Sequence, residues 1–123
     1  MIVDTDVLIW HMRGNMRAKK VLYNIGSFSI SAVSNMELIQ GLRNKSELKA
    51  LKDFLKDFGI TILPIDERIT NRAIFFMEEH FLKHDLRMAD ALIGSTASVL
   101  NKPLLTGNVK HYKILKGVNL KKF

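Results

Sequence analysis

Two carboxylates lie close together near one end of the chain. Asp4 and Asp6 follow directly after the apolar run at residues 1–3. Their oxygens are the hard ligands that Mg²⁺ prefers, and Mg²⁺ keeps several waters while binding only one or two carboxylates directly. The pair therefore predicts a divalent-cation site at the end of a buried strand. The alternative is that Asp4 or Thr5 only caps the helix that follows.

Glu37 is the second acidic residue with a candidate role in chemistry. It stands three residues after Ser34, and this spacing matches a capping box at the start of a helix that runs to about Leu42. Capping is therefore one interpretation of Glu37, and metal binding is the other. The two roles are compatible, because a helix N-terminus helps to hold a carboxylate near a cation.

Asp90 is the third candidate and the most telling one. In a helix predicted over residues 87–100, it shares a face with the apolar residues Leu86, Ile93 and Ala97. Burying a carboxylate on an apolar stripe is costly without a partner, which a metal ion or a group of hydrogen-bond donors would supply. The alternative is a first-turn acid that the helix dipole favours.

Uncharged polar residues follow a later apolar run. Thr106 and Asn108 come directly after Leu104-Leu105 and could orient a carboxylate or a metal-bound water. A plain turn is the alternative, since Gly107 and Asn108 are common turn residues.

A zinc site is not expected, although His80 and His84 stand one helical turn apart. Phe81 follows His80 where a metalloprotease helix carries its glutamate, and no third ligand stands out. We interpret both histidines as exposed or half-packed.

Composition narrows the class of protein. The 123 residues suit one domain, and the net charge of +7 favours an anionic partner, with nucleic acid first. The chain has no cysteine, which excludes disulfides and thiolate metal sites and fits a cytoplasmic location. Asp4 and Asp6 interrupt the first apolar stretch, which lacks the features of a signal peptide, and no apolar run reaches the ~20 residues of a membrane span.

The hydrophobic pattern predicts strands alternating with helices. Strands are expected at residues 1–3, 27–31, 60–65, 104–105 and 118–120, and helices opening at 7–10 and running over 34–42, 46–58, from 67 and over 87–100. This alternation predicts an α/β fold with a mostly parallel sheet covered on both faces. Asp4 and Asn108 would then lie at the carboxyl ends of strands, where such folds gather catalytic groups.

Four motifs in sequence resemble a PIN domain, of the kind found in the toxin subunits of VapBC toxin–antitoxin pairs. They are MIVDTDVLI, Met36-Glu37-Leu38, LRMADALIGSTA and LLTGNVKHY, and the resemblance covers essentially the whole chain. It implies a three-layer α/β/α sandwich with strand order 3-2-1-4-5. It also implies a Mg²⁺- or Mn²⁺-dependent endoribonuclease that hydrolyses RNA with metal-activated water, and a cognate antitoxin that inserts a basic side chain among the carboxylates.

The resemblance also assigns roles to residues. Asp4, Glu37 and Asp90 match the catalytic, metal-binding acids, and Asp6 matches a further acidic position. The fourth acidic position of the family is Asn108 here, so we expect one tightly held ion centred on Asp4 and Asp90. Supporting polar contacts are expected from Thr5, Thr106 and Asn108, and contacts with the RNA backbone from Arg13, Arg17, Lys110 and Lys113.

Two other functions fit part of the pattern. Asp4-x-Asp6 after a strand also opens haloacid-dehalogenase-like phosphatases, but Leu8 stands where Thr or Val is usual and no later Gly-Asp-x-x-x-Asp motif appears. A catalytically silent binding module would not need Asp4, Glu37 and Asp90 intact.

A homodimer is also expected. The N-terminal half is rich in large apolar residues of the kind that form interface cores. They are Trp10, Met12, Leu22, Tyr23, Met36 and Ile39.

Overall fold

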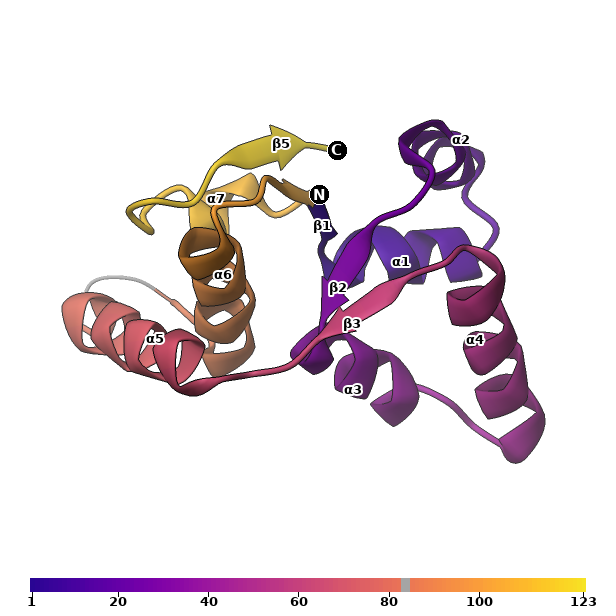
Figure 1. The fold of residues 1–123 in the computed structure, drawn as a ribbon, viewed down its shortest axis with the longest axis horizontal. Coiled ribbons are helices and arrows are strands. Elements are labelled where there is room, and N and C mark those ends of the chain that lie inside the picture. The colour runs from indigo at the N-terminus through magenta and orange to yellow at the C-terminus, as the bar shows by residue number, and fades with distance from the viewer. Residues whose placement is uncertain (83–84) are drawn as a thin grey trace.

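The computed structural model describes residues 1–82 and 85–123 and is drawn in Figure 1. The strands are β1 (Ile2–Val3), β2 (Ser29–Ser31), β3 (Thr61–Leu63), β4 (Leu104–Thr106) and β5 (Leu120–Lys122). The helices are α1 (Thr5–Met12), α2 (Met16–Ile25), α3 (Ala32–Gln40), α4 (Lys45–Asp57), α5 (Glu67–His80), α6 (Met88–Leu100) and α7 (Val109–Tyr112). The histidine at position 84, which we considered for zinc, lies outside the described residues.

The strands form one parallel sheet in the order β3-β2-β1-β4-β5, as the sequence and the resemblance predicted. Ile2 of β1 pairs with Ser29 of β2 on one side and with Leu104 of β4 on the other. The chain therefore runs outward from β1 to β3, crosses back, and continues from β4 to β5. In open α/β sheets, ligands bind beyond the carboxyl ends of the strands where this direction reverses, which here is between β1 and β4.

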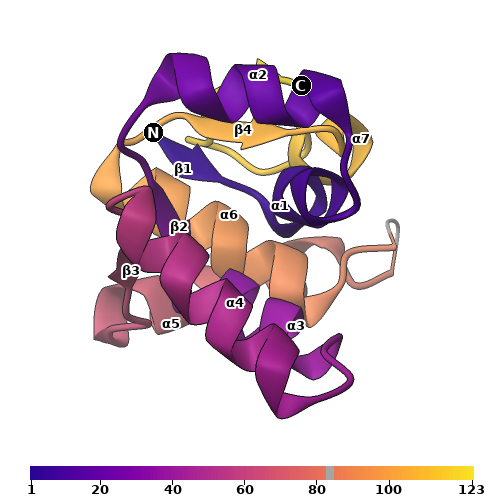
Figure 2. The ribbon, with the colours of Figure 1, turned by 90° about the vertical axis from the view of Figure 1, so that its right-hand side faces the viewer.

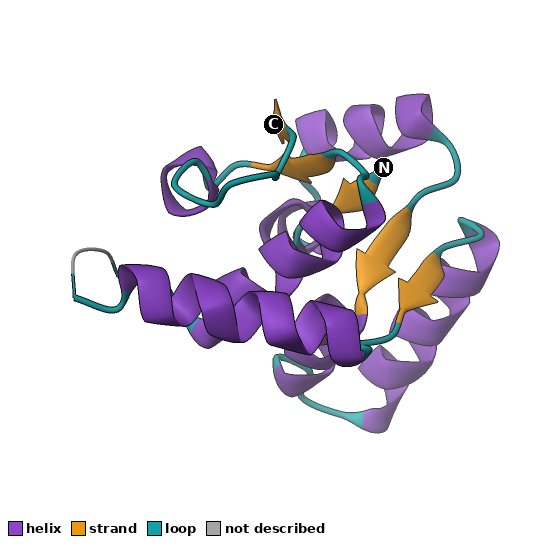
Figure 3. Cartoon of the chain, turned by 60° about the vertical axis from the view of Figure 1, so that its left-hand side comes forward, coloured by secondary structure: helices purple, strands orange, loops and turns teal. Residues whose placement is uncertain are grey.

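Two hydrophobic cores cover the two faces of the sheet, because successive strand residues point to opposite faces. Ile2 and Leu104 lie in the core beneath α5, α6 and α7, while Val3 and Leu105 lie in the core beneath α1, α2 and α4. Figure 3 shows helices on both sides of the strand layer. The three-layer prediction is confirmed.

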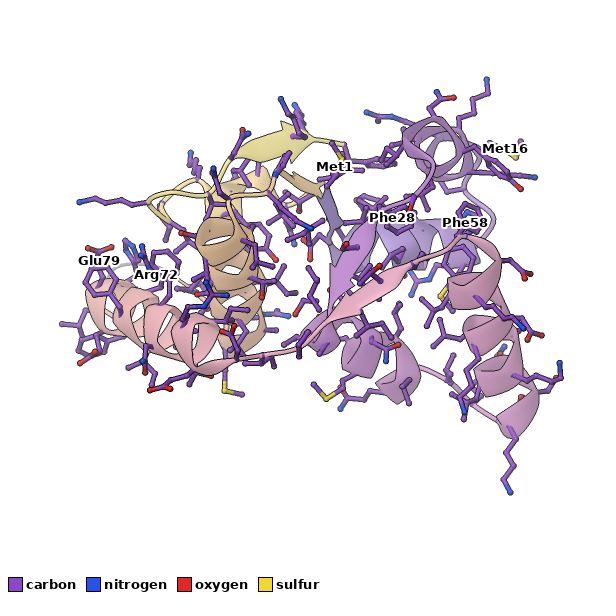
Figure 4. All side chains as sticks on the ribbon, viewed as in Figure 1. Met1, Met16, Phe28, Phe58, Arg72 and Glu79 are labelled. Atoms are coloured by element: carbon purple, nitrogen blue, oxygen red, sulfur yellow. The ribbon has the colours of Figure 1, made fainter. Side chains whose placement is uncertain are left out.

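Aromatic residues close the second core at its outer end. Phe28 is buried at the start of β2, and the ring of Phe58, which ends α4, lies 6.3 Å from it (Figure 4). Phe54 packs on Phe58 at 4.7 Å. These contacts hold α4 against the sheet.

Some local predictions were wrong. The capping box at Ser34 does not form, because α3 begins two residues earlier and its N-cap is Ser31, whose hydroxyl accepts from the Val33 N–H at 3.1 Å. The helices α2 and α7 were not predicted, and the last strand lies at 120–122 rather than 118–120. Asp66 caps α5 as expected, accepting from the Ile69 N–H at 2.9 Å.

No helix within residues 1–82 and 85–123 is both long and apolar enough to cross a membrane.

Candidate active site

Asp4 lies at the carboxyl end of β1, beside the end of β4, and is 4% exposed. Its Oδ1 accepts from the Thr5 N–H at 2.8 Å and from the Tyr112 hydroxyl at 3.1 Å. Its Oδ2 accepts from the Thr106 hydroxyl at 2.7 Å. Asp4 is also the N-cap of α1, so the capping role is confirmed, and the role in metal binding stays a prediction. All three donors are neutral, and they fix the direction in which the carboxylate points.

Asp6 is half-buried in the first turn of α1. Its Oδ1 accepts from the Val7 N–H at 2.7 Å, and its Oδ2 accepts from the Gly107 N–H at 3.0 Å. The second bond joins α1 to the turn that follows β4. The last residue of β4, Thr106, therefore holds Asp4, and the next residue, Gly107 in the turn that follows, holds Asp6.

Glu37 reaches the same edge of the sheet from α3. The Thr5 hydroxyl lies 2.7 Å from Glu37 Oε1 and 2.8 Å from the hydroxyl of the fully buried Ser34. Glu37 therefore does not act in the predicted capping box. Its carboxylate is placed by Thr5, the residue next to Asp4.

Asp90 lies in the first turn of α6, and its side chain is 13% exposed. The Tyr112 hydroxyl lies 3.5 Å from Asp90 Oδ1, and His111 Nδ1 lies 3.3 Å from Oδ2. The Arg87 N–H also contacts Oδ2 at 3.4 Å, as expected of a first-turn acid. One tyrosine hydroxyl thus bridges Asp4 and Asp90.

Burial sets the electrostatics of this group. Desolvation, together with the charge of Asp6, raises the pKa of Asp4 to about 7, although its three hydrogen bonds act in the opposite direction. Burial likewise raises the pKa of Asp6, with a further contribution from the charge of Asp90. Burial and the nearby carboxylates raise the pKa of Tyr112, so this residue stays a hydrogen-bond donor. The site holds more negative charge than its own donors neutralise.

This donor set fits a hard divalent cation. A buried carboxylate with a raised pKa and two acidic neighbours would be relieved of repulsion by a bound cation. Carboxylate oxygens are also the ligands that Mg²⁺ and Mn²⁺ favour. In the part of the chain that the structure describes, no three Asp, Glu or His side chains converge as a closed metal-binding group. Each carboxylate is instead drawn toward its own donors.

The predicted supporting residues are placed differently from one another. Thr5 and Thr106 contact the carboxylates directly, as expected. Asn108 is exposed at the N-cap of α7 and meets the site through its backbone N–H, which donates to the Thr106 hydroxyl at 2.9 Å. Exposed side chains are found at all four positions expected to contact RNA: Arg13, Arg17, Lys110 and Lys113.

Sequence reasoning missed Tyr112 and His111 as members of the site. Both follow the Thr106–Asn108 turn within one short helix, and the LLTGNVKHY motif contained them. Their importance comes from contacts with residues 21 to 108 positions away. A local pattern carries no signal for such contacts, so only the motif as a whole could have drawn attention to them.

Comparisons with known proteins agree on one family. The PIN domain model matches residues 1–116. Ribonuclease VapC10 of Mycobacterium tuberculosis is 36% identical over 116 residues, covering 91% of this chain and 85% of that protein. Ribonuclease VapC1 of Methanocaldococcus jannaschii is 31% identical over 123 residues, covering 98% and 85%.

Solved structures show the same fold. A toxin–antitoxin complex from Klebsiella pneumoniae contains a chain with a TM-score of 0.79 and 26% identity, covering 95% of this chain and 93% of that one. DNA-bound VapBC from Salmonella typhimurium gives a TM-score of 0.85 at 19% identity, covering 98% and 96%. The match of family, fold and strand order leaves no support for the phosphatase alternative. The chain belongs to the PIN domain family and, within it, to the VapC proteins.

Proposed function

We propose that this protein is a metal-dependent endoribonuclease and the toxin of a toxin–antitoxin pair. The observation that carries the proposal is that four carboxylates reach the end of the sheet where the strand order reverses between β1 and β4, each oriented by its own donor; they are Asp4, Asp6, Glu37 and Asp90. The relatives named Ribonuclease VapC support the same activity.

We assign Asp4 and Asp90 as the residues that would hold the ion, with Asp6 and Glu37 beside them. A bound Mg²⁺ or Mn²⁺ would supply a Lewis acid that lowers the pKa of water and offsets negative charge on the phosphate. Thr106 and Tyr112 orient Asp4, and Thr5 orients Glu37, so the acceptor oxygens are directed before an ion arrives.

RNA is the proposed substrate because the protein carries a net charge of +7 in spite of its acidic site. Lys110 and Lys113 are exposed on and just after α7, directly beyond the turn whose residues donate to Asp4 and Asp6. Arg13 is exposed at the end of α1. We propose that these cations hold the RNA backbone on either side of the reacting phosphate. An RNA substrate also supports a cytoplasmic location.

Cleavage of a labelled RNA by purified variants tests the activity. Asp4→Asn, Glu37→Gln and Asp90→Asn are each expected to lower the rate at least 100-fold, because groups that share one ion act as a unit. Asp57→Asn, an exposed acid of α4, is the matched control and should cleave normally. Cleavage that persists in EDTA, or in all three variants, would contradict the assignment.

The antitoxin proposal is supported by a groove of about 760 Å³ that is lined by side chains of α1, α3 and α4. Apolar side chains such as Leu42 and Phe54 line it, and Glu37 of the carboxylate group forms part of its wall. An amphipathic segment bound there would place a basic side chain next to the acidic site. The toxin–antitoxin complexes among the structural neighbours support such a partner.

Co-expression with the protein encoded by the neighbouring small gene tests this partner. It should relieve growth arrest and block RNA cleavage. Ala50→Glu, which places a charge at an exposed position in the groove, should weaken this protection at least tenfold. Thr70→Glu on α5, outside the groove, should not. Equal protection of both variants would place the antitoxin elsewhere.

A homodimer is the remaining proposal, with a corrected set of interface residues. Leu22 is fully buried in the second core, and Trp10 packs against Phe123, so neither is free for a partner. Met36 and Ile39 of α3 are 55% and 42% exposed. We keep these two residues, which lie near Glu37, as the proposed dimer interface. Light scattering should give a dimer for the wild type and a monomer for Ile39→Lys. A wild-type monomer at micromolar concentration would contradict the proposal.

A further inference from the structure

Three side chains from distant parts of the sequence form a stack beside the acidic site. The Phe123 ring follows β5 and stacks on Trp10 of α1, with centroids 5.1 Å apart and planes 26° apart. The Arg17 guanidinium of α2 also lies over the Phe123 ring, 4.6 Å from its centroid. We call Trp10, Phe123 and Arg17 the aromatic stack. Figure 2 shows the end of β5 beside α2, where these segments meet.

At one end of the aromatic stack, the Trp10 ring lies in close contact with Gly107, whose N–H donates to Asp6. A Cβ placed on Gly107 would lie 2.6 Å from Trp10 Cη2, 2.8 Å from Cζ3 and 3.0 Å from Asp6 Oδ2. No side chain fits there unless Trp10 moves, and Phe123 blocks part of that movement. Gly107, whose N–H donates to Asp6, therefore lies close against the indole ring and the carboxylate on its Cα side.

Phe123 also reaches the site through its backbone. Its N–H donates to the Thr106 carbonyl at 2.9 Å, next to the pairing of Lys122 with Thr106 that joins β5 to β4. The Thr106 hydroxyl in turn donates to Asp4. Phe123 therefore acts on Thr106 through a hydrogen bond and on Gly107 through the Trp10 ring.

We propose that Phe123 and Trp10 are positioning residues that hold the Thr106–Gly107 turn and thereby set the directions of the Asp4 and Asp6 carboxylates. Neither residue touches the reacting atoms. This inference rests on the proposed function in one respect, namely that the Asp4 and Asp6 carboxylates take part in binding the ion. Groups that orient metal ligands affect metal affinity strongly, often by 10–100-fold.

Phe123→Ala distinguishes the contribution of the ring from that of the backbone hydrogen bond, because alanine lacks the ring but keeps the N–H that donates to the Thr106 carbonyl. Two readouts follow. Hydrogen exchange of the Gly107 amide, measured by NMR on the metal-free protein, should speed up about tenfold or more because the turn loses its support. Affinity for Mn²⁺, measured by calorimetry, should fall roughly tenfold.

Fluorescence gives an independent view of the aromatic stack, because Trp10 is the single tryptophan of the chain. Its emission should shift to the red in Phe123→Ala as water reaches the ring. Phe123→Tyr keeps the ring and should restore exchange, affinity and emission. Phe75→Ala removes a half-exposed aromatic residue of α5 and serves as the control for loss of a phenyl ring.

In the cleavage assay, Phe123→Ala should need more metal for half-maximal activity yet approach the wild-type kcat at saturating Mn²⁺. A second variant, Gly107→Ala, attacks the same contact from the other side and should also weaken Mn²⁺ binding. Circular dichroism checks that both variants are folded.

Unchanged exchange of the Gly107 amide in folded Phe123→Ala would overturn the proposal, even if the emission shifts, because the stack would then be packing alone. A raised KM for RNA with unchanged Mn²⁺ affinity would also overturn it, since the aromatic stack would then be a surface for RNA. If the wild type binds no Mn²⁺, the metal dependence under the proposed function fails instead. The exchange experiment still decides whether Phe123 positions the turn.

Discussion

Replacing Asp4 with asparagine should make the metal-free protein more stable. A rise of the Asp4 pKa from 3.8 to about 7 on folding corresponds to about 4 kcal/mol, at ~1.4 kcal/mol per unit. Between these values the folded chain binds the proton more tightly than the unfolded chain. The free energy of unfolding therefore falls as pH rises through this window and stays lowered above pH 7.

Asparagine removes this charge and keeps much of the local bonding. Its carbonyl oxygen still accepts from the Thr5 N–H and the Tyr112 hydroxyl, while the Thr106 hydroxyl must turn to accept from the new amide. Allowing for that rearrangement, we expect a gain of about 2–3 kcal/mol at pH 8, or roughly 10 °C in Tm for a domain of this size. At pH 4.5, where the folded wild type carries a proton on Asp4, the charge penalty falls to about 1 kcal/mol and most of the gain disappears.

Thermal unfolding followed by circular dichroism in EDTA, at pH 8 and pH 4.5, is the assay. Asp66→Asn is the control, because it makes the same chemical change at a carboxylate whose pKa is shifted in the opposite direction. The hydrogen bond from the Ile69 N–H lowers the pKa of Asp66 in the folded state. That variant should gain no stability at pH 8. Adding Mg²⁺ should raise the Tm of the wild type but not of Asp4→Asn. An Asp4→Asn variant less stable than the wild type at pH 8 would refute the view that burying the charged Asp4 carboxylate destabilises the folded protein.

Three further predictions concern groups around the same carboxylates. Tyr112→Phe removes a donor to Asp4, so protons should compete better with Mn²⁺, and calorimetry should show affinity lost several-fold at pH 6.5 and largely recovered at pH 8.5. Thr5→Val leaves Glu37 without its hydroxyl partner and should lower the rate of RNA cleavage about tenfold, with a loss of about 1–3 kcal/mol in stability because the buried Ser34 hydroxyl loses the same partner. Asn108→Asp should tighten Mn²⁺ binding in calorimetry by adding a carboxylate near the turn, and unchanged affinity would mean that position 108 is only a turn residue.

The sequence predicted the sheet because each strand carries its own signal. The apolar runs at 1–3 and 104–105 are too short for helices, and the alternation at 27–31 has the period of a strand. The helix α2 was missed although Ala18, Val21, Leu22 and Ile25 have helical spacing after the cap residue Asn15.

The acids of the site were predictable, whereas the groups that hold them were not. Asp4, Glu37 and Asp90 stand out in the sequence because a carboxylate at the end of a buried strand or on a helix that packs on the core is costly to bury without a partner. The prediction of a capping box at Ser34 was wrong because β2 ends at Ser31, one helical turn earlier, and Ser31 is therefore the N-cap of α3. Tyr112 and Phe123 act through contacts made only when β4 and β5 join the sheet, so no local pattern marks them.

The central position of β1 has a consequence for the order in which the protein becomes active during synthesis. Asp4 is made before its donors Thr106 and Tyr112, which lie 102 and 108 residues later in the chain. At ~5–20 residues per second, translation leaves the carboxylate incomplete for about 5–20 s. The groove between α1, α3 and α4, in contrast, is built from residues 9–54. A partner that recognises the groove could therefore bind the growing chain before the last strands complete the acidic site, so that a newly made molecule is inhibited before it can cleave anything.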